Sequence, residues 1–357
     1  MPTTHFRILD LLKAVACNLI VLHHLAYYGP MTDYLRPLMP DVVGWFSQHA
    51  RIAVHAFLTM GGFLAARSLA GMAVDEPLRA VWRRFVKLVP PYMAAICIAV
   101  AASALAARWM THDSISAPPT LAQFAAHALL LQSILGYESL SAGAWYVAID
   151  FQLFALLTLL LWLAGRGRHS WWLAPVLVGG CCAASLLVFN LDPAWDAWAP
   201  YFFGSYGLGA LAWWAADRQR GPLAAVVLSG AILLLGGLAL ELEFRSRIAV
   251  ALGTALLLVL ACRGLVRLPG QNARLAAYLG RISYAVFLLH FPVSLVVNAA
   301  FTRFAPAQPE AQAAGVLLAW LASLAAGAAF HRWVEVPLSA LADSARGKRP
   351  AQGVRTT

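Results

Sequence analysis

The chain has 357 residues, of which 61% are hydrophobic and only 12% are charged, and its mean hydropathy is +0.70. A soluble globular protein carries about twice that share of charge, so the composition excludes a soluble domain and indicates a helical membrane protein. The net charge of +10 is spread between apolar segments, which excludes a nucleic-acid partner, and the five cysteines lie in apolar stretches without ligand spacing, which predicts no metal site.

Ten apolar segments of spanning length predict an all-α bundle of about ten transmembrane helices. Their expected ranges are 8–28, 49–68, 86–107, 144–163, 172–190, 198–216, 222–240, 247–262, 279–300 and 312–333. The segment 121–135 contains Gln123, His127 and Gln132 and is shorter than the ~20 residues needed to cross. We therefore expect it to lie in the interface or to be re-entrant. Pro337 is expected to stop the last helix.

Among the ionisable residues of the first span are Asp10, Lys13 and His24. A charged group at the centre of a membrane helix costs about 2.5–3.5 kcal/mol on insertion scales, so such groups generally serve a function. Lys13 and His24 lie about three helical turns apart, which places them on one stripe of the helix, roughly 16 Å apart along its axis. A base and a cation on one face predict chemistry rather than anchorage.

The second span carries His55, followed by Gly61–Gly62, which allows either a close helix contact or a helix break. Arg83, Arg84 and Lys87 lead into the third span. As anchors at the inner face they follow the positive-inside rule. As a cluster they also suit the phosphates of a nucleotide-bearing donor such as coenzyme A. The residues alone leave both interpretations open.

Polar residues recur in two later spans. Asp150 and Gln152 lie in the fourth span, at a depth from the outer face similar to that of His24, and His290 lies near the midplane of the ninth. A carboxylate beside an imidazole orients the ring and favours its protonated form, as a general base requires. The alternative to a catalytic role is that such a histidine only forms a hydrogen bond with a neighbouring carbonyl. The remaining polar candidates are His55 of the second span and Ser283 and Tyr284 of the ninth.

Charge asymmetry predicts the topology. With ten spans and a cytoplasmic N-terminus, 20 of the 26 lysine and arginine residues lie at or beside the inner face. The exceptions are Arg36, Arg51, Arg108, Arg245, Arg247 and Arg303. If 121–135 also crossed, every later loop would invert. Both termini are therefore expected in the cytoplasm, with residues 1–340 as one membrane domain and residues 341–357 as a short basic tail.

Six motifs follow one another along almost the whole chain. They are Arg7 to Lys13 with His24, Ile52 to Phe63, Arg84 to Lys87 before Pro90, Trp145 to Phe154, Gly280 to Pro292, and Val334 to Pro337. In this order they resemble the acyltransferase 3 family, which includes bacterial O-acetyltransferases of cell-surface sugars. Lys13 and Lys87 stand where the family usually has arginine, Asp150 where it has glutamate, and Gly61 where it has serine.

The resemblance implies an O-acyltransferase of the bacterial inner membrane, which moves an acyl group, usually acetyl, from cytosolic acyl-CoA to a hydroxyl of a cell-envelope carbohydrate. It implies His24 as the catalytic base, a histidine being poised near neutral pH, with Lys13 on the path between donor and acceptor and Asp150 orienting or stabilising charge. The implied donor-binding residues are Arg83, Arg84 and Lys87. The expected partners are membrane lipid, acyl-CoA and the acceptor glycan, with no permanently bound cofactor.

A proton-coupled secondary transporter or flippase is the alternative function, because the intramembrane residues His24, Asp150 and His290 also suit a proton relay. The sequence shows no inverted repeat and no matching pair of broken spans, which are typical of such transporters. The basic cluster before the third span would also have no role in one.

Overall fold

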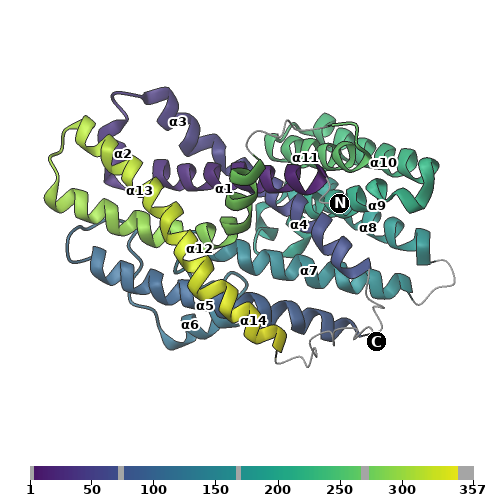
Figure 1. The fold of residues 1–357 in the computed structure, drawn as a ribbon, viewed down its shortest axis with the longest axis horizontal. Coiled ribbons are helices and arrows are strands. Elements are labelled where there is room, and N and C mark those ends of the chain that lie inside the picture. Colours follow the sequence, from purple (N-terminus) through teal and green to yellow (C-terminus); the bar gives the residue numbers. More distant parts are fainter. Residues whose placement is uncertain (1–3, 71–75, 166–169, 267–272, 345–357) are drawn as a thin grey trace, which may run out of the picture.

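The structure, a computed structural model, describes residues 4–70, 76–165, 170–266 and 273–344. Its long helices are α1 (Thr4–Tyr27), α4 (Ala53–Ala70), α5 (Pro77–Ala106), α7 (Ala144–Gly165), α8 (Ser170–Leu187), α9 (Ala199–Ala216), α10 (Gly221–Leu242), α11 (Ser246–Arg263), α12 (Ala273–Phe304) and α13 (Pro309–Phe330). The shorter ones are α2 (Pro30–Leu35), α3 (Pro40–His49), α6 (Leu121–Ala128) and α14 (Val336–Ser344). Most long helices run side by side in one bundle (Figure 1). The described residues contain no strand, so the predicted all-α fold is confirmed, whereas residues 345–357 of the predicted tail lie outside the description.

Within the described ranges, nine helical segments are long and apolar enough to cross a membrane, against about ten predicted. The segment that misses this criterion is 198–216, which forms α9. Nearly all its side chains are buried between α4, α8, α10 and α11. They meet protein rather than lipid, so α9 can carry glycine, tyrosine and tryptophan without a uniformly apolar surface. The cytoplasmic position of the termini stays a prediction.

Helices α4 and α9 approach each other through glycine. A Cβ added at Gly62 would stand 1.8 Å from the carbonyl oxygen of Tyr206, and one added at Gly209 would stand 1.9 Å from that of Thr59. Neither position has room for a side chain, which is how membrane helices gain close packing without a hydrophobic driving force. Helix α4 continues unbroken through this contact, so of the two interpretations of Gly61–Gly62 the close contact is confirmed.

The segment between α5 and α7 does not cross the bundle. Its only helix, α6, has eight residues, which span about 12 Å, so the prediction that 121–135 does not cross is confirmed, and its place in the membrane interface stays a prediction. The chain then turns inward at Leu130, which is 1% exposed and has a left-handed backbone with φ 58°, a conformation that costs free energy in any residue but glycine. The neutral ring of His127 holds this turn, because its Nδ1–H donates to the carbonyl of Gln123 (2.9 Å) and its Nε2 accepts the N–H of Leu140 (3.1 Å).

The inward turn determines where α7 begins. Gln132, fully buried, donates from its Nε2 to the carbonyl of Ala144 (3.1 Å), the first residue of α7. The neighbouring Gly143 packs on α12, where an added Cβ would stand 2.9 Å from the ring of Phe287. Helix α7 therefore begins within the bundle, level with the middle of α12, and not at the bundle surface.

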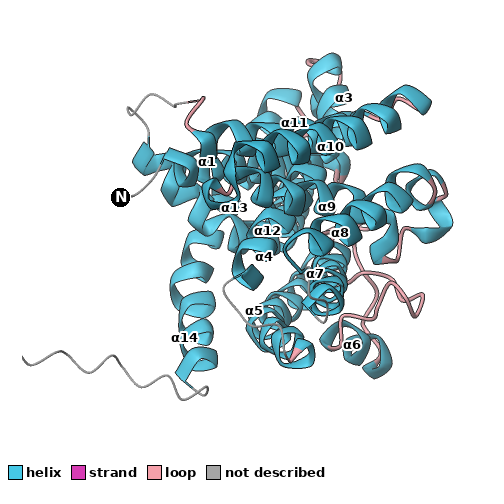
Figure 2. Cartoon of the chain, turned by 90° about the vertical axis from the view of Figure 1, so that its right-hand side faces the viewer, coloured by secondary structure: helices cyan, strands magenta, loops and turns pink. Residues whose placement is uncertain are grey.

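The prediction that Pro337 stops the last helix is wrong. A single π-helical turn, His331–Glu335, joins α13 to α14, and the three follow one another as one diagonal in Figure 1. Pro337 lies in the first turn of α14, where a missing N–H is tolerated. Within the π turn, Nδ1 of His331 donates to Oε2 of Glu335 (2.8 Å). Helix α14 stands at the edge of the bundle (Figure 2).

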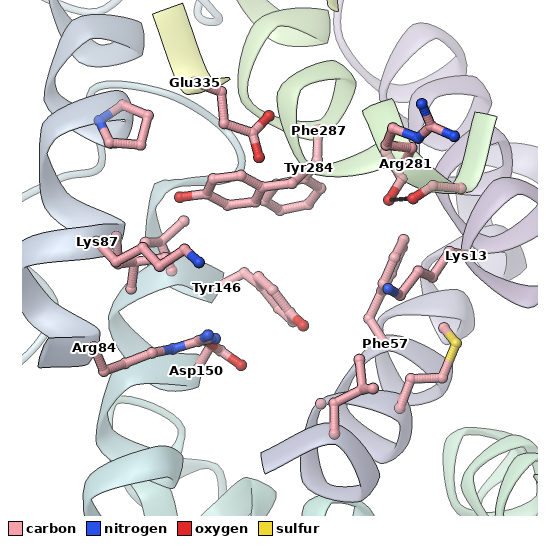
Figure 3. Close-up of a pocket in the computed structure, with 18 of the residues that line it drawn as sticks. Lys13, Phe57, Arg84, Lys87, Tyr146, Asp150, Arg281, Tyr284, Phe287 and Glu335 are labelled. Atoms are coloured by element: carbon pink, nitrogen blue, oxygen red, sulfur yellow. Dashed lines mark hydrogen bonds and ion pairs between the residues drawn. The ribbon is translucent and has the colours of Figure 1, made fainter. Parts of the chain in front are cut away.

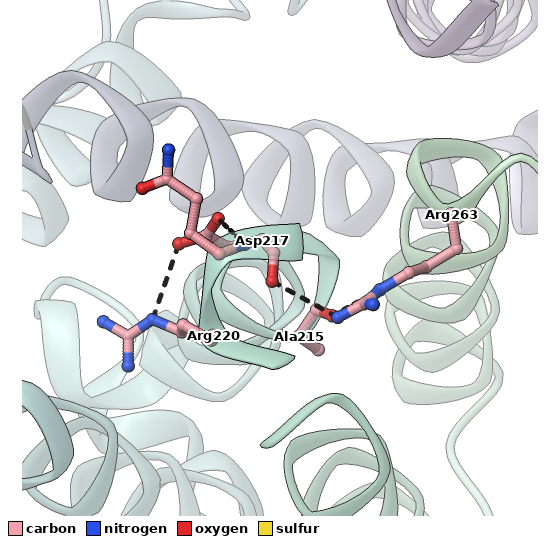
Figure 4. A network of polar contacts seen from close by, with 5 residues as sticks. Ala215, Asp217, Arg220 and Arg263 are labelled. Carbon is pink, nitrogen blue, oxygen red and sulfur yellow. Dashed lines mark hydrogen bonds and ion pairs between the residues drawn. The ribbon is translucent and has the colours of Figure 1, made fainter. Parts of the chain in front are cut away.

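Basic residues counted above as inner-face anchors also cap helix ends (Figure 4). Arg263, at the end of α11, donates from Nε (3.1 Å) and Nη2 (2.8 Å) to the carbonyl of Ala215 in the last turn of α9. Asp217 accepts the N–H of Gln219 (3.0 Å) and pairs with Arg220 (3.7 Å). The last carbonyls of a helix lack intrahelical partners and carry partial negative charge, so Arg263 satisfies groups that α9 leaves open.

Candidate functional site

An ion pair between α5 and α7 marks the centre of the site. Nη2 of Arg84 contacts Oδ2 of Asp150 directly, and the guanidinium lies over the ring of Phe154, 5.4 Å from its centroid. The side chain of Asp150 is 9% exposed and that of Arg84 is 37% exposed. A buried carboxylate needs a paired charge, and Arg84 supplies it.

The depth of Asp150 differs from the expected one. The sequence predicted it in an outer layer near His24, yet it lies with the basic residues of α5. The reason is the inward start of α7: Asp150 lies six residues beyond Ala144, which carries it about 9 Å further along the axis. Its partner is a guanidinium and not the imidazole that we expected. A part for Asp150 in catalysis stays a prediction.

A cavity of about 340 Å³ opens beside this ion pair, between α1, α4, α5, α7 and α12. Its charged lining residues are Lys13, Arg84, Lys87, Arg281, Asp150 and Glu335. Lys13 and Arg281 face Arg84, Lys87 and Asp150 across it (Figure 3). Cations outnumber carboxylates, which favours an anionic ligand. The volume lies near the lower end of the ~300–1,000 Å³ typical of ligand pockets.

Half of the predicted site residues meet in this cavity. They are Lys13, Arg84, Lys87, Asp150, Ser283 and Tyr284. The hydroxyl of Ser283 donates to the carbonyl of Gly280 (2.9 Å), whereas the buried hydroxyl of Tyr284 finds no hydrogen-bond partner among the described residues. Buried polar groups are almost always paired, so this hydroxyl is available to a bound ligand.

Three predicted residues lie elsewhere. Arg83 is exposed on α5 and does not line the cavity, because adjacent residues of a helix point in different directions. Gln152 turns away on α7, where its Oε1 accepts the N–H of Ala199 (3.0 Å) at the start of α9. Asp10 packs at the crossing of α1 and α12, where a Cβ added at Gly280 would stand 2.6 Å from the Asp10 carbonyl oxygen. The structure gives the last two packing roles.

His24 and His290 form a second polar group. Nδ1 of His24 lies 2.5 Å from Nε2 of His290, and the rings are nearly parallel, with an interplanar angle of 8°. His290 lies one turn of α12 beyond Phe287, which lines the cavity. Lys13 and His24 both face α12, so their predicted position on one stripe of α1 is confirmed.

Three aromatic side chains of the cavity lining form a cluster. Phe57 of α4, Tyr146 of α7 and Phe287 of α12 all line the cavity. Their centroids are 5.2 Å apart between Tyr146 and Phe287, 6.3 Å between Phe57 and Tyr146, and 6.4 Å between Phe57 and Phe287. Phe287 also packs on His290, with 5.8 Å between the ring centroids, so the cluster lies next to the histidine pair.

A second and larger cavity, of about 1,060 Å³, lies where α4 and α7 begin. His55 lines it, with Nδ1 2.7 Å from the hydroxyl of Ser205. Flat aromatic rings and charged groups of both signs share the lining, among them Trp145, Tyr201, Phe202, Arg51, Glu138, Asp196 and Arg247. Helices α4 and α7 run from this cavity towards the first, so the two cavities approach each other near Phe57 and Tyr146.

The sequence interpretation missed three ionisable residues of the first cavity, namely Tyr146, Arg281 and Glu335. Each lies inside one of the motifs quoted above, and this position was the signal that could have found them. Glu335 lies in the π turn that follows α13, and Ser339 of α14 lines the cavity as well.

Comparison with known proteins supplies the family. The family model of acyltransferase 3, described as an acyltransferase domain, matches residues 6–331, nearly the whole chain. The matched range includes every charged residue of the first cavity except Glu335. No curated protein matches the chain, and no solved structure does.

Proposed function

Because this chain belongs to the acyltransferase 3 family and is a membrane-bound acyltransferase, we propose that it transfers an acyl group, in the first place acetyl, from cytosolic acyl-CoA to a hydroxyl of a cell-envelope carbohydrate. The observation that carries the donor half of this proposal is the convergence of Lys13, Lys87 and Arg281 on the cavity beside the Arg84 ion pair. Clustered ammonium and guanidinium groups suit the phosphates of coenzyme A.

Two parts of the acyl-CoA donor would bind at different places in the cavity. Lys87 and Arg281 are exposed at its mouth, where they would meet the nucleotide phosphates. A volume of about 340 Å³ suits the acyl-pantetheine arm rather than the whole cofactor, and Lys13 lies along that arm, half-buried. In the expected topology the mouth faces the cytoplasm, where acyl-CoA is found.

The chemistry needs one base. The acceptor oxygen attacks the thioester carbonyl carbon while its proton passes to His24, so that a C–O bond forms and the C–S bond breaks. The proton then passes to the thiolate, and free coenzyme A leaves. A sugar hydroxyl is a weak acid, and a histidine suits its deprotonation near neutral pH. The acceptor would enter through the second cavity. For the acyl group to reach the acceptor, the rings of Phe57, Tyr146 and Phe287 must move.

The test uses the purified protein in lipid vesicles with labelled acetyl-CoA and, in parallel, other acyl-CoAs. Release of free coenzyme A and transfer of label to lipid-linked or polymeric glycan are measured. Lys87→Ala should raise the KM for acetyl-CoA about fivefold, the effect of one partly exposed charge contact. Arg79→Ala is the control, because Arg79 is an exposed cation of α5 that pairs with Glu76 (2.6 Å) outside the cavity.

Two results would overturn the proposal. One is the absence of thioester cleavage and acyl transfer with every acyl-CoA offered, which is also what a transporter would give. The other is a KM for Lys87→Ala equal to that of Arg79→Ala. The transporter itself draws less support than the sequence suggested, because Asp150, one member of its expected proton relay, is paired with Arg84.

A further inference from the structure

In the hydrogen bond between His24 and His290, the contacts of His290 determine which ring donates. Nδ1 of His290 lies 2.6 Å from the carbonyl oxygen of Phe287, one turn back on α12. A carbonyl oxygen only accepts hydrogen bonds, so this nitrogen carries the proton. In the neutral ring of His290, Nε2 is then left with a lone pair and can only accept.

The protonation of His290 also determines which nitrogen of His24 carries the proton. Its Nδ1 lies 2.5 Å from Nε2 of His290, which accepts, so Nδ1 of His24 is the donor and carries the proton. The neutral ring of His24 therefore has its lone pair on Nε2. The result is a chain of two donated hydrogen bonds that ends on the Phe287 carbonyl.

We infer that His290 is the positioning residue of the acyl transfer: it holds His24 in the tautomer whose Nε2 is the proton acceptor. This inference rests on the proposed function, in which His24 is the base. In many enzymes a carboxylate orients the base through its other nitrogen, but none of the described carboxylates pairs with either ring, and Asp150 is bound to Arg84. Here a second imidazole takes that place.

The burial of the pair supports a specific role. His290 is 1% exposed, and both of its nitrogens are used. The ring of His24 is further held by Tyr28 and His23, with centroids 5.4 Å and 5.1 Å away. When Nε2 of His24 takes the proton of the acceptor, its Nδ1–H still has an acceptor in His290, so the imidazolium forms without a change of partner.

The experiment compares three substitutions in the full chain, reconstituted in vesicles. In His290→Gln, the side-chain oxygen reaches the place of Nε2 and can accept from His24, so we expect kcat to stay within about tenfold of the parent. In His290→Asn, the shorter amide reaches only the place of Nδ1. We expect kcat to fall about 100-fold or more, with the KM for acyl-CoA unchanged, because the base loses its orientation and the donor pocket does not. His290→Leu should behave as His290→Asn, and it decides the question if the asparagine variant does not fold.

Failure of the inference and failure of the proposed function give different results. If the parent transfers no acyl group, or if His24→Ala transfers as the parent does, the proposed function falls. If the parent is active and His24→Ala is not, equal kcat values for His290→Gln and for the asparagine or leucine variant overturn the inference alone. A rise in KM without loss of kcat also overturns it, because His290 would then act on donor binding.

Discussion

Gly62→Ala is expected to force apart the two helices at the centre of the bundle. The added Cβ would stand 1.8 Å from the carbonyl oxygen of Tyr206, 2.7 Å from its carbonyl carbon and 3.1 Å from its Cα. These are backbone atoms of α9, so no side-chain rotation relieves the clash. To reach the 3.4 Å at which ordinary contact begins, α4 and α9 must separate locally by about 1.6 Å.

The cost follows from this displacement. Overpacking a tight interior costs about 1–3 kcal/mol, and more where the backbone must move. Because α9 is buried along nearly its whole length, we expect a loss near the upper end, about 3 kcal/mol, which lowers Tm by on the order of 5 °C. The movement would also displace Gly61, which lines the cavity, so acyl transfer should fall together with stability.

Thermal unfolding of the purified protein in detergent is the assay, with two matched controls. Gly230→Ala lies on α10, where an added Cβ meets nothing within 4 Å, and it should not lower Tm. Gly61→Ala brings its Cβ to 3.2 Å from the ring edge of Tyr206, and it should fall between that control and Gly62→Ala. A Tm for Gly62→Ala at or above that of the parent would refute the reasoning, because α4 and α9 could not then approach as described.

Three further predictions concern the ion pair and the inward turn. Asp150→Asn keeps the shape of the side chain but leaves Arg84 without its counter-charge. Because Arg84 is 37% exposed, we expect a loss of stability of about 1–2 kcal/mol, which is only part of the ~3–5 kcal/mol lost when a buried ion pair is broken. Asp150→Glu should retain most of the Tm, and a parental Tm for the asparagine variant would contradict this prediction. In Gly61→Ser the added Cβ would stand 3.4 Å from Oδ1 of Asp150, so the serine hydroxyl should donate to the carboxylate. The serine variant should therefore be about 1 kcal/mol more stable than Gly61→Ala. This difference should vanish in an Asp150→Ala background, which lacks the acceptor, and its persistence there would contradict the hydrogen bond. Burial lowers the pKa of His127, so the folded protein binds fewer protons than the unfolded one below about pH 6.5, and the stability of the turn is complete above that pH and is lost as the pH falls. Hydrogen exchange at the Leu140 amide, corrected for its intrinsic rate, should therefore accelerate between pH 7 and 5, and a constant corrected rate would count against the hydrogen bond to His127.

The helices and most of their positions could be predicted from the sequence. In a bilayer every backbone group must be satisfied within its own segment, so apolar length is a local property that a single chain displays. The stripe of Lys13 and His24 needed only the period of a helix. The family resemblance linked Lys13, Arg84 and Lys87 to the donor, and all three line one cavity. That Asp150, Ser283 and Tyr284 line the same cavity was not predicted, because spacing within one helix says nothing of which helices meet.

The depth of Asp150 and the partner of His24 were decided by the tertiary structure. Asp150 lies below its expected level because the chain before α7 folds inward, held by the neutral ring of His127 and by Gln132. The partner of His24 is His290, 266 positions away, and not a carboxylate. Hydropathy and periodicity report only how each segment meets lipid or protein. The pairing of two buried groups depends on where separate helices begin and which of their faces pack together, and those quantities exist only once the bundle has formed.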